Sequence, residues 1–307
     1  MQKQSLRKNT YFYRPYNLPL SFPAVAFIGD NWILPDTPLE YMHFHNCIEI
    51  GHCIQGKGTM YVENKEIAFK PEDISIICEN TLHISKSGNN EHSKWEYIFF
   101  NPHLMFDDSF VPNNSFPYPP YFTNVFDVNS NPHIHFLVKR MFVEYHEKKA
   151  NYKHSLIGLF LALMVAMTRT ASIHTDNIEE AGDIRSSLTY INQNYTKKLQ
   201  IKDISKVCNL SEPHFRRIFG EVMHMSPLNY INRLRIRKSC QEIYRGEKAL
   251  NDIALEVGFT TLSSFNRQFH ALLGCSPRDW RKKIRASEDS YEITSLDDDA
   301  TIDIFNF

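Results

Sequence analysis

A repeat of 50 residues in the last third of the chain constrains its fold more than any other feature. When the sequence is shifted by 50 positions, six residues fall on the same or a similar residue: Phe215 on Phe265, Arg217 on Arg267, Phe219 on Phe269, Ser226 on Ser276, Pro227 on Pro277 and Tyr230 on Trp280. Each copy contains two apolar patterns of helical period, separated by a short turn. The repeat therefore predicts two copies of one helical unit.

Residues at the expected helix ends define this unit further. Gly258 follows the last apolar position of its helix, where glycine adopts the left-handed conformation without strain. Ser211 is a typical N-cap for the next helix of the first copy. The Ser-Pro pairs at 226–227 and 276–277 begin a further helix, because proline in the first turn has no hydrogen bond to lose. Two tandem helix-turn-helix units are the simplest account, and a helical bundle without a nucleic-acid role is the alternative.

The distribution of charge favours nucleic-acid binding over a plain bundle. Residues 184–286 contain 19 basic and eight acidic residues, whereas the net charge of the whole chain is −1. We expect this segment to bind duplex DNA with an affinity that falls steeply as salt rises. Residues 287–307 hold seven acidic residues and no basic one, which predicts a mobile acidic tail. The polar segment 174–183 is predicted to be a linker.

Burial of the repeated phenylalanines predicts which side chains of the second helix in each unit face outward. Arginine reads guanine and asparagine reads adenine in a major groove. The expected base contacts are Pro213, His214, Arg216 and Arg217 in the first copy and Leu262, Ser263, Asn266 and Arg267 in the second. The expected phosphate contacts are Lys197, Lys198, Lys202, Arg233, Arg235, Arg237, Lys238 and Lys282. The helix between the units, residues 227–244, is about 27 Å long and spaces the reading helices by roughly one DNA turn.

Residues 253–281, IALEVGFTTLSSFNRQFHALLGCSPRDWR, contain I-A-x-x-x-G-F, F-x-R-x-F, G-x-S-P and an aromatic residue before arginine. This order resembles the signature of the AraC/XylS family of transcriptional regulators, and the resemblance covers residues 184–286. The first copy departs from the family pattern at His224, where glycine is usual, at Gly220, where a basic residue is common, and at Glu212-Pro213. The resemblance implies that the partner is double-stranded DNA. It also implies RNA polymerase as a partner if the protein is an activator, the commoner output in this family.

The N-terminal part has a different pattern. Short β-branched or aromatic runs at 47–54, 59–64, 74–78 and 95–100 are separated by turn residues at spacings of about ten, which predicts an antiparallel barrel or jelly roll. Two helical patterns follow at about 133–149 and 152–170. The second is apolar nearly all round, so it is buried either in the core or in the interface of a homodimer.

The segment 43-HFHNCIEIGHCIQG-56 resembles the first cupin motif, and 71-PEDISIICENTLH-83 resembles the second in reduced form. By this resemblance, His43, His45, Glu49 and His83 could hold a metal ion, and a metal-dependent cupin enzyme fused to a DNA-binding module is one interpretation. Sensor domains of similar sequence instead bind a small effector, often a sugar, without metal or another cofactor. The expected effector contacts are His43, His45, Glu49, Tyr61, His83 and Trp95, of which Trp95 either stacks on the effector or fills the core.

Other classes of function lack their sequence signals. The chain has no P-loop, dinucleotide fingerprint or nucleophile elbow, and its six cysteines form no C-x-x-C pair. The N-terminus does not resemble a signal peptide, and the longest apolar stretch is too short to cross a bilayer. We therefore expect a cytoplasmic regulator rather than an enzyme, with no membrane partner. Its predicted fold is α+β: a cupin-like barrel followed by helices over 1–173, then an all-α tandem helix-turn-helix domain over 184–286.

Overall fold

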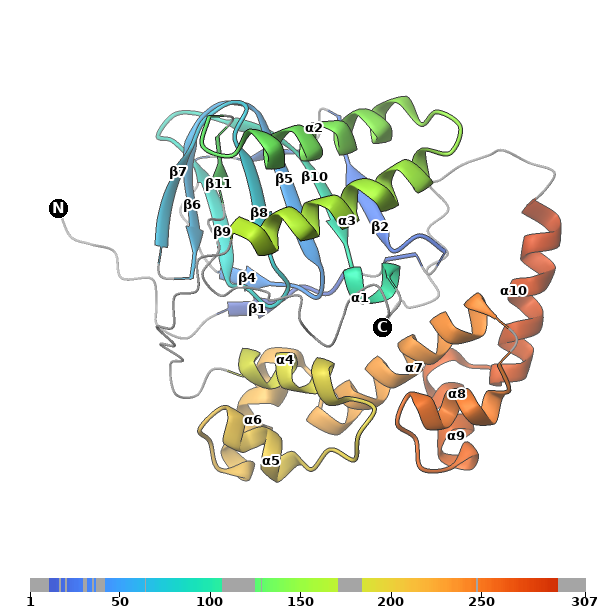
Figure 1. Cartoon of the computed structure of the whole chain (residues 1–307). Coiled ribbons are helices and arrows are strands. Elements are labelled where there is room, and N and C mark those ends of the chain that lie inside the picture. Colours follow the sequence, from blue (N-terminus) through green and yellow to red (C-terminus); the bar gives the residue numbers. More distant parts are fainter. Residues whose placement is uncertain are drawn as a thin grey trace. The chain divides into compact units, whose positions relative to one another are not determined.

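The computed structural model describes residues 11–106, 125–170 and 184–291, apart from 17, 20, 30–31, 35, 37–41, 64, 128 and 247. The chain divides into two compact units (Figure 1). One comprises Met1–Leu18 and Phe22–Asn177, and the other comprises Pro19–Ser21 and Ile178–Phe307. The first unit is rich in β-sheet and the second is helical, which confirms the predicted α+β class. The linker predicted over 174–183 lies outside the described residues.

The first unit contains two β-sheets. The first sheet has the order β1 (Tyr11–Tyr13), β4 (Met42–Phe44), β9 (His83–Ser87), β6 (Gly58–Val62) and β7 (Lys65–Phe69). The second has the order β11 (Val125–Phe126), β8 (Ile74–Ile77), β5 (Ile48–Gln55), β10 (Ser93–Phe100) and β2 (Ala24–Phe27), with β3 (Ile33–Leu34) also paired to β10. Neighbouring strands are antiparallel except for β1 and β4. Within the described residues the ladders form two separate sheets, so the architecture is a sandwich rather than a closed barrel.

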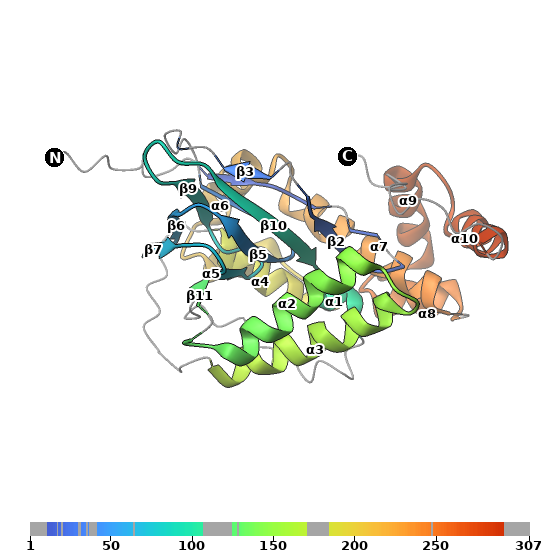
Figure 2. The ribbon, with the colours of Figure 1, turned by 90° about the horizontal axis from the view of Figure 1, so that it is seen from above.

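The central strands of the second sheet, β5, β8 and β10, are almost entirely buried. Helices α2 (Pro132–Glu147) and α3 (Tyr152–Thr170) cover one face of this sheet (Figure 2), and a short helix, α1 (Pro102–Met105), follows β10. Side chains alternate along β5, so that Ile48 and Ile50 pack with the two helices whereas Cys47 and Cys53 pack with residues of the first sheet. The strand therefore borders two separate cores.

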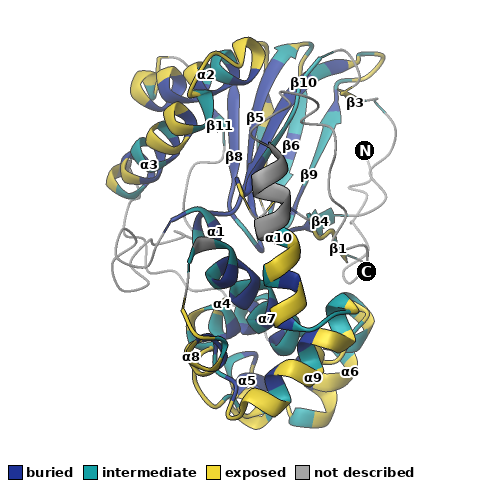
Figure 3. Cartoon of the chain, turned by 90° about the vertical axis from the view of Figure 1, so that its right-hand side faces the viewer, coloured by how far each residue is buried: buried dark blue, intermediate teal, exposed yellow. Residues whose placement is uncertain are grey.

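Helix α3 spans the residues expected from the sequence, 152–170. Leu156, Phe160 and Leu163 are fully buried, whereas Ile157 and Val165 are each 36% exposed on the outer side of the helix. Exposed residues also mark the outer side of α2 (Figure 3). Among the described residues, every helix is too short or too polar to cross a membrane.

The second unit consists of seven helices within the described residues: α4 (Arg185–Asn194), α5 (Ile201–Val207), α6 (Glu212–Met223), α7 (Pro227–Arg245), α8 (Leu250–Glu256), α9 (Leu262–Leu273) and α10 (Pro277–Tyr291). Helices α5 and α6 form the first helix-turn-helix unit, α8 and α9 form the second, and α7 connects them. His224 and Gly274 follow α6 and α9 in the same left-handed conformation, with φ of 52° and 68°.

Helix α10 continues to Tyr291, so the first residues of the predicted acidic tail are helical. The boundary expected at residue 286 is not marked by proline or glycine, and helix ends without such residues are poorly specified by sequence. The rest of the predicted tail, residues 292–307, lies outside the described residues.

Candidate DNA-binding surface and effector site

The repeated phenylalanines fix the orientation of α6 and α9. Four phenylalanines are fully buried inside the second compact unit: Phe215, Phe219, Phe265 and Phe269. Because each pair is spaced by four residues, burial of one side of the helix leaves the positions between them on the surface. All eight predicted base contacts are exposed on these two helices (Figure 3). The two units thus present equivalent positions, with Arg216 of α6 matching Asn266 of α9.

The predicted phosphate contacts divide into two groups. The exposed residues are Lys197, Lys198, Lys202 and Lys282, and the half-buried ones are Arg233, Arg235, Arg237 and Lys238. Nζ of Lys197 donates to Oδ1 of Asn194 at 2.9 Å, on the surface of the helical unit. The half-buried group lies on α7, between the two helix-turn-helix units.

Arg235, one of the predicted phosphate contacts, makes packing contacts within the protein. Its Nε donates to the carbonyl oxygen of Tyr195 at 2.8 Å, and its Nη2 donates to the carbonyl oxygen of Lys197 at 2.9 Å. The guanidinium also lies over the ring of Phe259, 5.7 Å from its centroid. Burial lowers the pKa of this arginine. These contacts direct the guanidinium toward the protein, which sequence spacing alone does not indicate.

Both arginines on the exposed face of α6 form ion pairs within the helix. Nη2 of Arg216 lies 2.7 Å from Oε1 of Glu212, one turn earlier. Nη1 of Arg217 lies 2.7 Å from Oε1 and 2.9 Å from Oε2 of Glu221, one turn later. Spacing by four residues brings each pair together. The predicted base-reading arginines of α6 are therefore compensated by acids of the same helix.

In the first unit, four of the predicted effector residues form one cluster inside the sandwich. Oε2 of Glu49 lies 3.2 Å from Nε2 of His45 and 3.4 Å from Nε2 of His83. The rings of His43 and His83 have centroids 4.3 Å apart, since these residues face each other across β4 and β9. Glu49 comes from β5 of the second sheet, so the cluster joins the two sheets.

The charges in this cluster are unequal. Burial raises the pKa of Glu49, but the contacts with His83 and His45 lower it more, and the net shift is downward. Burial lowers the pKa of His83, but the charge of Glu49 together with the hydrogen bonds to Glu49 and Thr81 raises it by more. Burial also lowers the pKa of His45, and burial together with the charge of His83 lowers the pKa of His43 to about 3. At neutral pH the cluster thus holds a carboxylate on Glu49 and neutral imidazoles on His43 and His45, and Glu49 favours the protonated form of His83.

The hydrogen bonds of His45 and His83 show what else the cluster could hold. Their Nδ1 atoms donate to the carbonyl oxygens of Cys47 and Thr81, both at 2.9 Å, because a carbonyl oxygen only accepts. Both Nε2 atoms are therefore left facing Glu49, and a proton or a cation must separate these acceptors. Ligand atoms of His43, Glu49 and His83 all lie within 4.8 Å of one another. Imidazole and carboxylate ligands suit zinc, manganese, iron or nickel.

Two predicted effector residues lie apart from the cluster. Trp95 is fully buried in the core, where its Nε1 donates to Oγ of Ser93 at 3.2 Å and its ring meets Phe69 edge-on. Tyr61 alternates on β6 with Met60 and Val62, which both face the inter-sheet core. Its side chain therefore points to the outer face of the first sheet.

The structure places two other aromatic rings beside the cluster. Tyr16 lies edge-on to His45, with centroids 5.6 Å apart, and stacks on Phe99 at 4.2 Å. Its backbone N–H donates to Oδ1 of Asn46 at 2.8 Å. Tyr16 belongs to a segment without a regular period, so the one available signal was the local richness in tyrosine.

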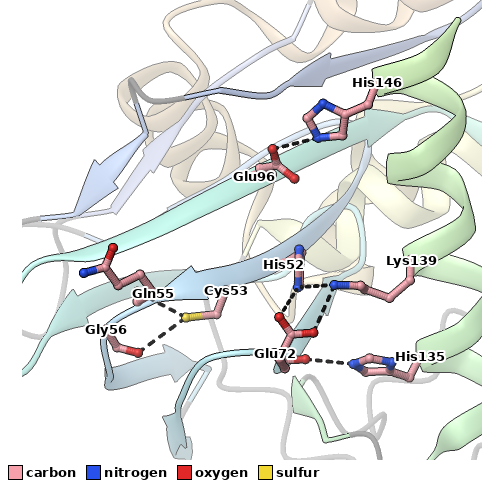
Figure 4. A network of polar contacts seen from close by, with 9 residues as sticks. All are labelled: His52, Cys53, Gln55, Gly56, Glu72, Glu96, His135, Lys139 and His146. Atoms are coloured by element: carbon pink, nitrogen blue, oxygen red, sulfur yellow. Dashed lines mark hydrogen bonds and ion pairs between the residues drawn. The ribbon is translucent and has the colours of Figure 1, made fainter.

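The other face of the second sheet carries a separate polar network (Figure 4). Nζ of Lys139, on α2, donates to Nε2 of His52 at 3.1 Å and to Oε2 of Glu72 at 3.0 Å. Further along α2, Nε2 of His146 lies 2.9 Å from Oε1 of Glu96. Burial and the charge of Lys139 lower the pKa of His52 to about 4. The network ties α2 to β5, to β10 and to the turn before β8.

Comparison with known proteins agrees with this division. An AraC-like ligand binding domain matches residues 32–163, and a helix-turn-helix domain matches residues 204–283. The chain is 22% identical over 264 residues to the raffinose operon transcriptional regulatory protein RafR of Pediococcus pentosaceus, covering 85% of this chain and 94% of that protein. It is 22% identical over 251 residues to the uncharacterized HTH-type transcriptional regulator YdeC of Bacillus subtilis (strain 168), covering 78% and 86%. It is 25% identical over 126 residues to the lactose operon transcription activator of Staphylococcus xylosus, covering 41% and 44%.

The matched helix-turn-helix domain is a DNA-binding domain, and these relatives are transcriptional regulators rather than enzymes. The alternative of a metal-dependent cupin enzyme is therefore not supported. The ligand-binding match contains the histidine and glutamate cluster, and the helix-turn-helix match contains both α6 and α9. The chain thus belongs to the AraC family of transcriptional regulators, with an AraC-like ligand-binding domain and a helix-turn-helix DNA-binding domain.

Proposed function

We propose that this regulator activates transcription when a sugar binds at the cluster of His43, His45, Glu49 and His83. The cluster itself carries this proposal. A carboxylate and three imidazoles inside an otherwise apolar sandwich are costly to bury, and perturbed pKa values of this kind concentrate at functional sites. Two relatives are named as regulators of raffinose and lactose operons, and one of them is a transcription activator. These names support a sugar effector and an activating role.

On DNA, α6 and α9 are the proposed reading helices. They carry exposed arginine and asparagine at positions related by the 50-residue repeat. Helix α7 is 19 residues long, or about 28 Å, which suits reading helices in successive major grooves. The exposed lysines Lys197, Lys198, Lys202 and Lys282 are the proposed phosphate contacts. Because DNA is its target, we place the protein in the cytoplasm.

A second copy of the chain is the proposed partner of α3. Ile157, Leu161 and Val165 follow one another at intervals of four residues, so they form a stripe along the helix. Two of them are 36% exposed and Leu161 is half-buried. An apolar stripe on the outside of a helix is typical of helix pairing. An activated dimer would then contact RNA polymerase.

The effector site and the dimer helices are connected through β5. Glu49 faces the first sheet from this strand, where it contacts His83. His52 faces α2 from the other side of the strand (Figure 4). A small displacement of β5 by an effector at Glu49 would move the contact of His52 with Lys139. The strand thereby offers a physical route from effector binding to dimer geometry.

Thermal unfolding of the full chain tests the effector proposal. We would titrate mono-, di- and trisaccharides, including lactose and raffinose, with and without EDTA. A specific sugar should raise the unfolding temperature with EDTA present, since a ligand at 100 times its Kd stabilises by about 2.7 kcal/mol. Glu49→Gln should abolish the rise, and Glu91→Gln, at a surface carboxylate, should not. If no sugar has an effect and EDTA alone destabilises the protein, the cluster is a metal site instead.

A further inference from the structure

The acidic residues of α6 distinguish it from its repeat partner, α9. Glu212 and Glu221 contact Arg216 and Arg217 at 2.7 Å, and all four side chains are more than a third exposed. The residues at the corresponding positions of α9 are Leu262 and Ala271, neither of which carries a charge. Helix α6 thus has two acids for its two arginines, whereas α9 has one arginine and no acid.

These ion pairs matter more for binding than for folding. Exposed pairs within a helix contribute little to stability, so they are not needed to hold α6 in place. A carboxylate that approaches DNA, however, is repelled by the phosphates and removes the attraction of the arginine that it neutralises. In the major groove the favourable position for a glutamate is opposite an amino group, such as N4 of cytosine.

The two acids differ in their position along the helix. Glu212 is the first residue of α6, and Glu221 lies nine residues further along. The first residues of a reading helix are the ones that reach base edges. Nine residues correspond to about 13 Å along the axis, which takes Glu221 away from that end. The bond from Nε of Arg216 to Glu212, 3.0 Å, further restricts the arginine beside the acid.

Resting on the proposed contact of α6 with DNA, we propose that Glu212 is a specificity-determining residue. It positions the Arg216 guanidinium and reads a cytosine next to the guanine that Arg216 contacts. On duplexes without this cytosine, the same carboxylate remains unpaired and weakens binding. Glu221 merely neutralises Arg217, so it lowers affinity equally for all sequences. The first helix-turn-helix unit then discriminates among sequences and adds little general affinity.

The test uses the full chain as wild type, Glu212→Gln and Glu221→Gln. These variants remove the same charge, from the same helix and from the same kind of ion pair. The probes are a duplex pool with a randomised 30-base-pair segment and the duplex that the wild-type protein enriches from it. For each protein, Kd is measured on both probes, and enrichment from the random pool is repeated. Equal unfolding temperatures of the three proteins verify that the fold is kept.

We expect Glu212→Gln to bind the random pool more tightly and to lose about tenfold in the ratio of its two affinities. Its enriched pool should lose the preference for cytosine at one position. Glu221→Gln should tighten binding to both probes by the same factor and keep that ratio. Equal changes of the ratio in the two variants would overturn the inference. If instead the wild-type protein enriches no sequence, the proposed DNA contact itself fails.

Discussion

Nε of Arg235 donates to the carbonyl oxygen of Tyr195 across 2.8 Å, and this bond joins α7 to the end of α4. The same guanidinium lies over Phe259, in the turn between α8 and α9. A single side chain thus contacts both the segment that leads from α4 into the first helix-turn-helix unit and the turn of the second unit. The spacing of the two reading helices depends on this junction, because α7 is the connection between them.

Replacing Arg235 by lysine should lower the free energy of unfolding of the second compact unit, which contains α4–α10, by about 1–3 kcal/mol. Lysine keeps the charge but lacks the planar fork that donates to two carbonyl oxygens at once. Urea unfolding, followed by circular dichroism, measures the loss. Arg278→Lys, at an exposed position of α10, is the matched control and should be nearly neutral. A similar loss in both variants would mean that the junction has no special role.

Alanine at two glycines of this unit should have effects of opposite sign. Gly258 has φ of +95°, and a Cβ there would lie 2.5 Å from the carbonyl oxygen of Tyr195. We expect Gly258→Ala to cost about 2 kcal/mol or more. Gly220 lies within α6 with open space around it, so Gly220→Ala should stabilise by about 0.5–1 kcal/mol. Urea midpoints that move in the same direction would contradict this reading of the packing.

Asn266→Ala should weaken specific DNA binding by about 1–3 kcal/mol and relax the preference at one base pair. The side chain is exposed on α9 beside the other predicted base contacts. Fluorescence anisotropy with an enriched duplex and a random duplex separates the two effects. Asn251→Ala, at an exposed position of α8, controls for the general effect of losing an exposed asparagine. If Asn266→Ala weakens both duplexes equally, Asn266 contacts phosphate rather than a base.

Acid should destabilise the first unit through His52. The pKa of this imidazole is lowered to about 4 by burial and Lys139, whereas it is about 6.5 in an unfolded chain. Between these values the unfolded chain binds more protons, so stability falls as the pH is lowered through this range, and is fully present above it. At pH 5 the loss from this group is about 2 kcal/mol.

The remaining groups that face His52 are Glu72, Glu96 and His135, and Lys139 is the one that can be removed most simply. In Lys139→Met the pKa of His52 should rise, and the difference in stability between pH 7.5 and pH 5 should shrink. Urea unfolding at the two values measures it. Lys65→Met, at an exposed position of β7, should leave the difference unchanged. An unaltered acid response in Lys139→Met would exclude His52 as its source.

A charge on α3 should dissociate the proposed dimer. Ile157→Glu places a carboxylate at one end of the apolar stripe, and burying it against a second copy would carry a large desolvation penalty. Sedimentation velocity should show a dimer for the wild-type chain and a monomer for the variant. Leu228→Glu introduces the same charge at an exposed leucine of α7 and should remain dimeric. A monomeric wild type at high micromolar concentration would refute the proposed interface.

The sequence predicted the helical unit best, because repeated residues such as Phe215 and Phe265 have one physical role in both copies. It also predicted the convergence of His43, Glu49 and His83 through the resemblance to the cupin motifs, although Glu49 comes from the other sheet. It left open whether Trp95 fills the core, where the structure places it, and it did not predict the outward position of Tyr61. Those depend on the register between strands, which composition does not encode.

The contacts of Tyr16 and Arg235 were not predicted from the sequence for a different reason. Tyr16 reaches the cluster from a segment without secondary structure, and no periodic pattern describes the path of such a segment. Arg235 is surrounded in the sequence by other basic residues on α7, so its charge suggested DNA. In the structure it donates to carbonyl oxygens about 40 positions away. Every residue has a backbone carbonyl group, so the sequence does not indicate which of them a side chain contacts.

Because side chains alternate along β5, substitutions on its two faces affect different neighbours. Glu49 and Cys53 border the space between the sheets, while Ile50 and His52 border the helices. Substitutions on the inner face change the side chains beside Glu49, whereas substitutions on the outer face change those that pack against the helices, because neighbouring residues of a strand point in opposite directions. Descendants of this protein can therefore vary the proposed effector site on the inner face while the side chains that pack against α2 and α3 on the outer face stay the same.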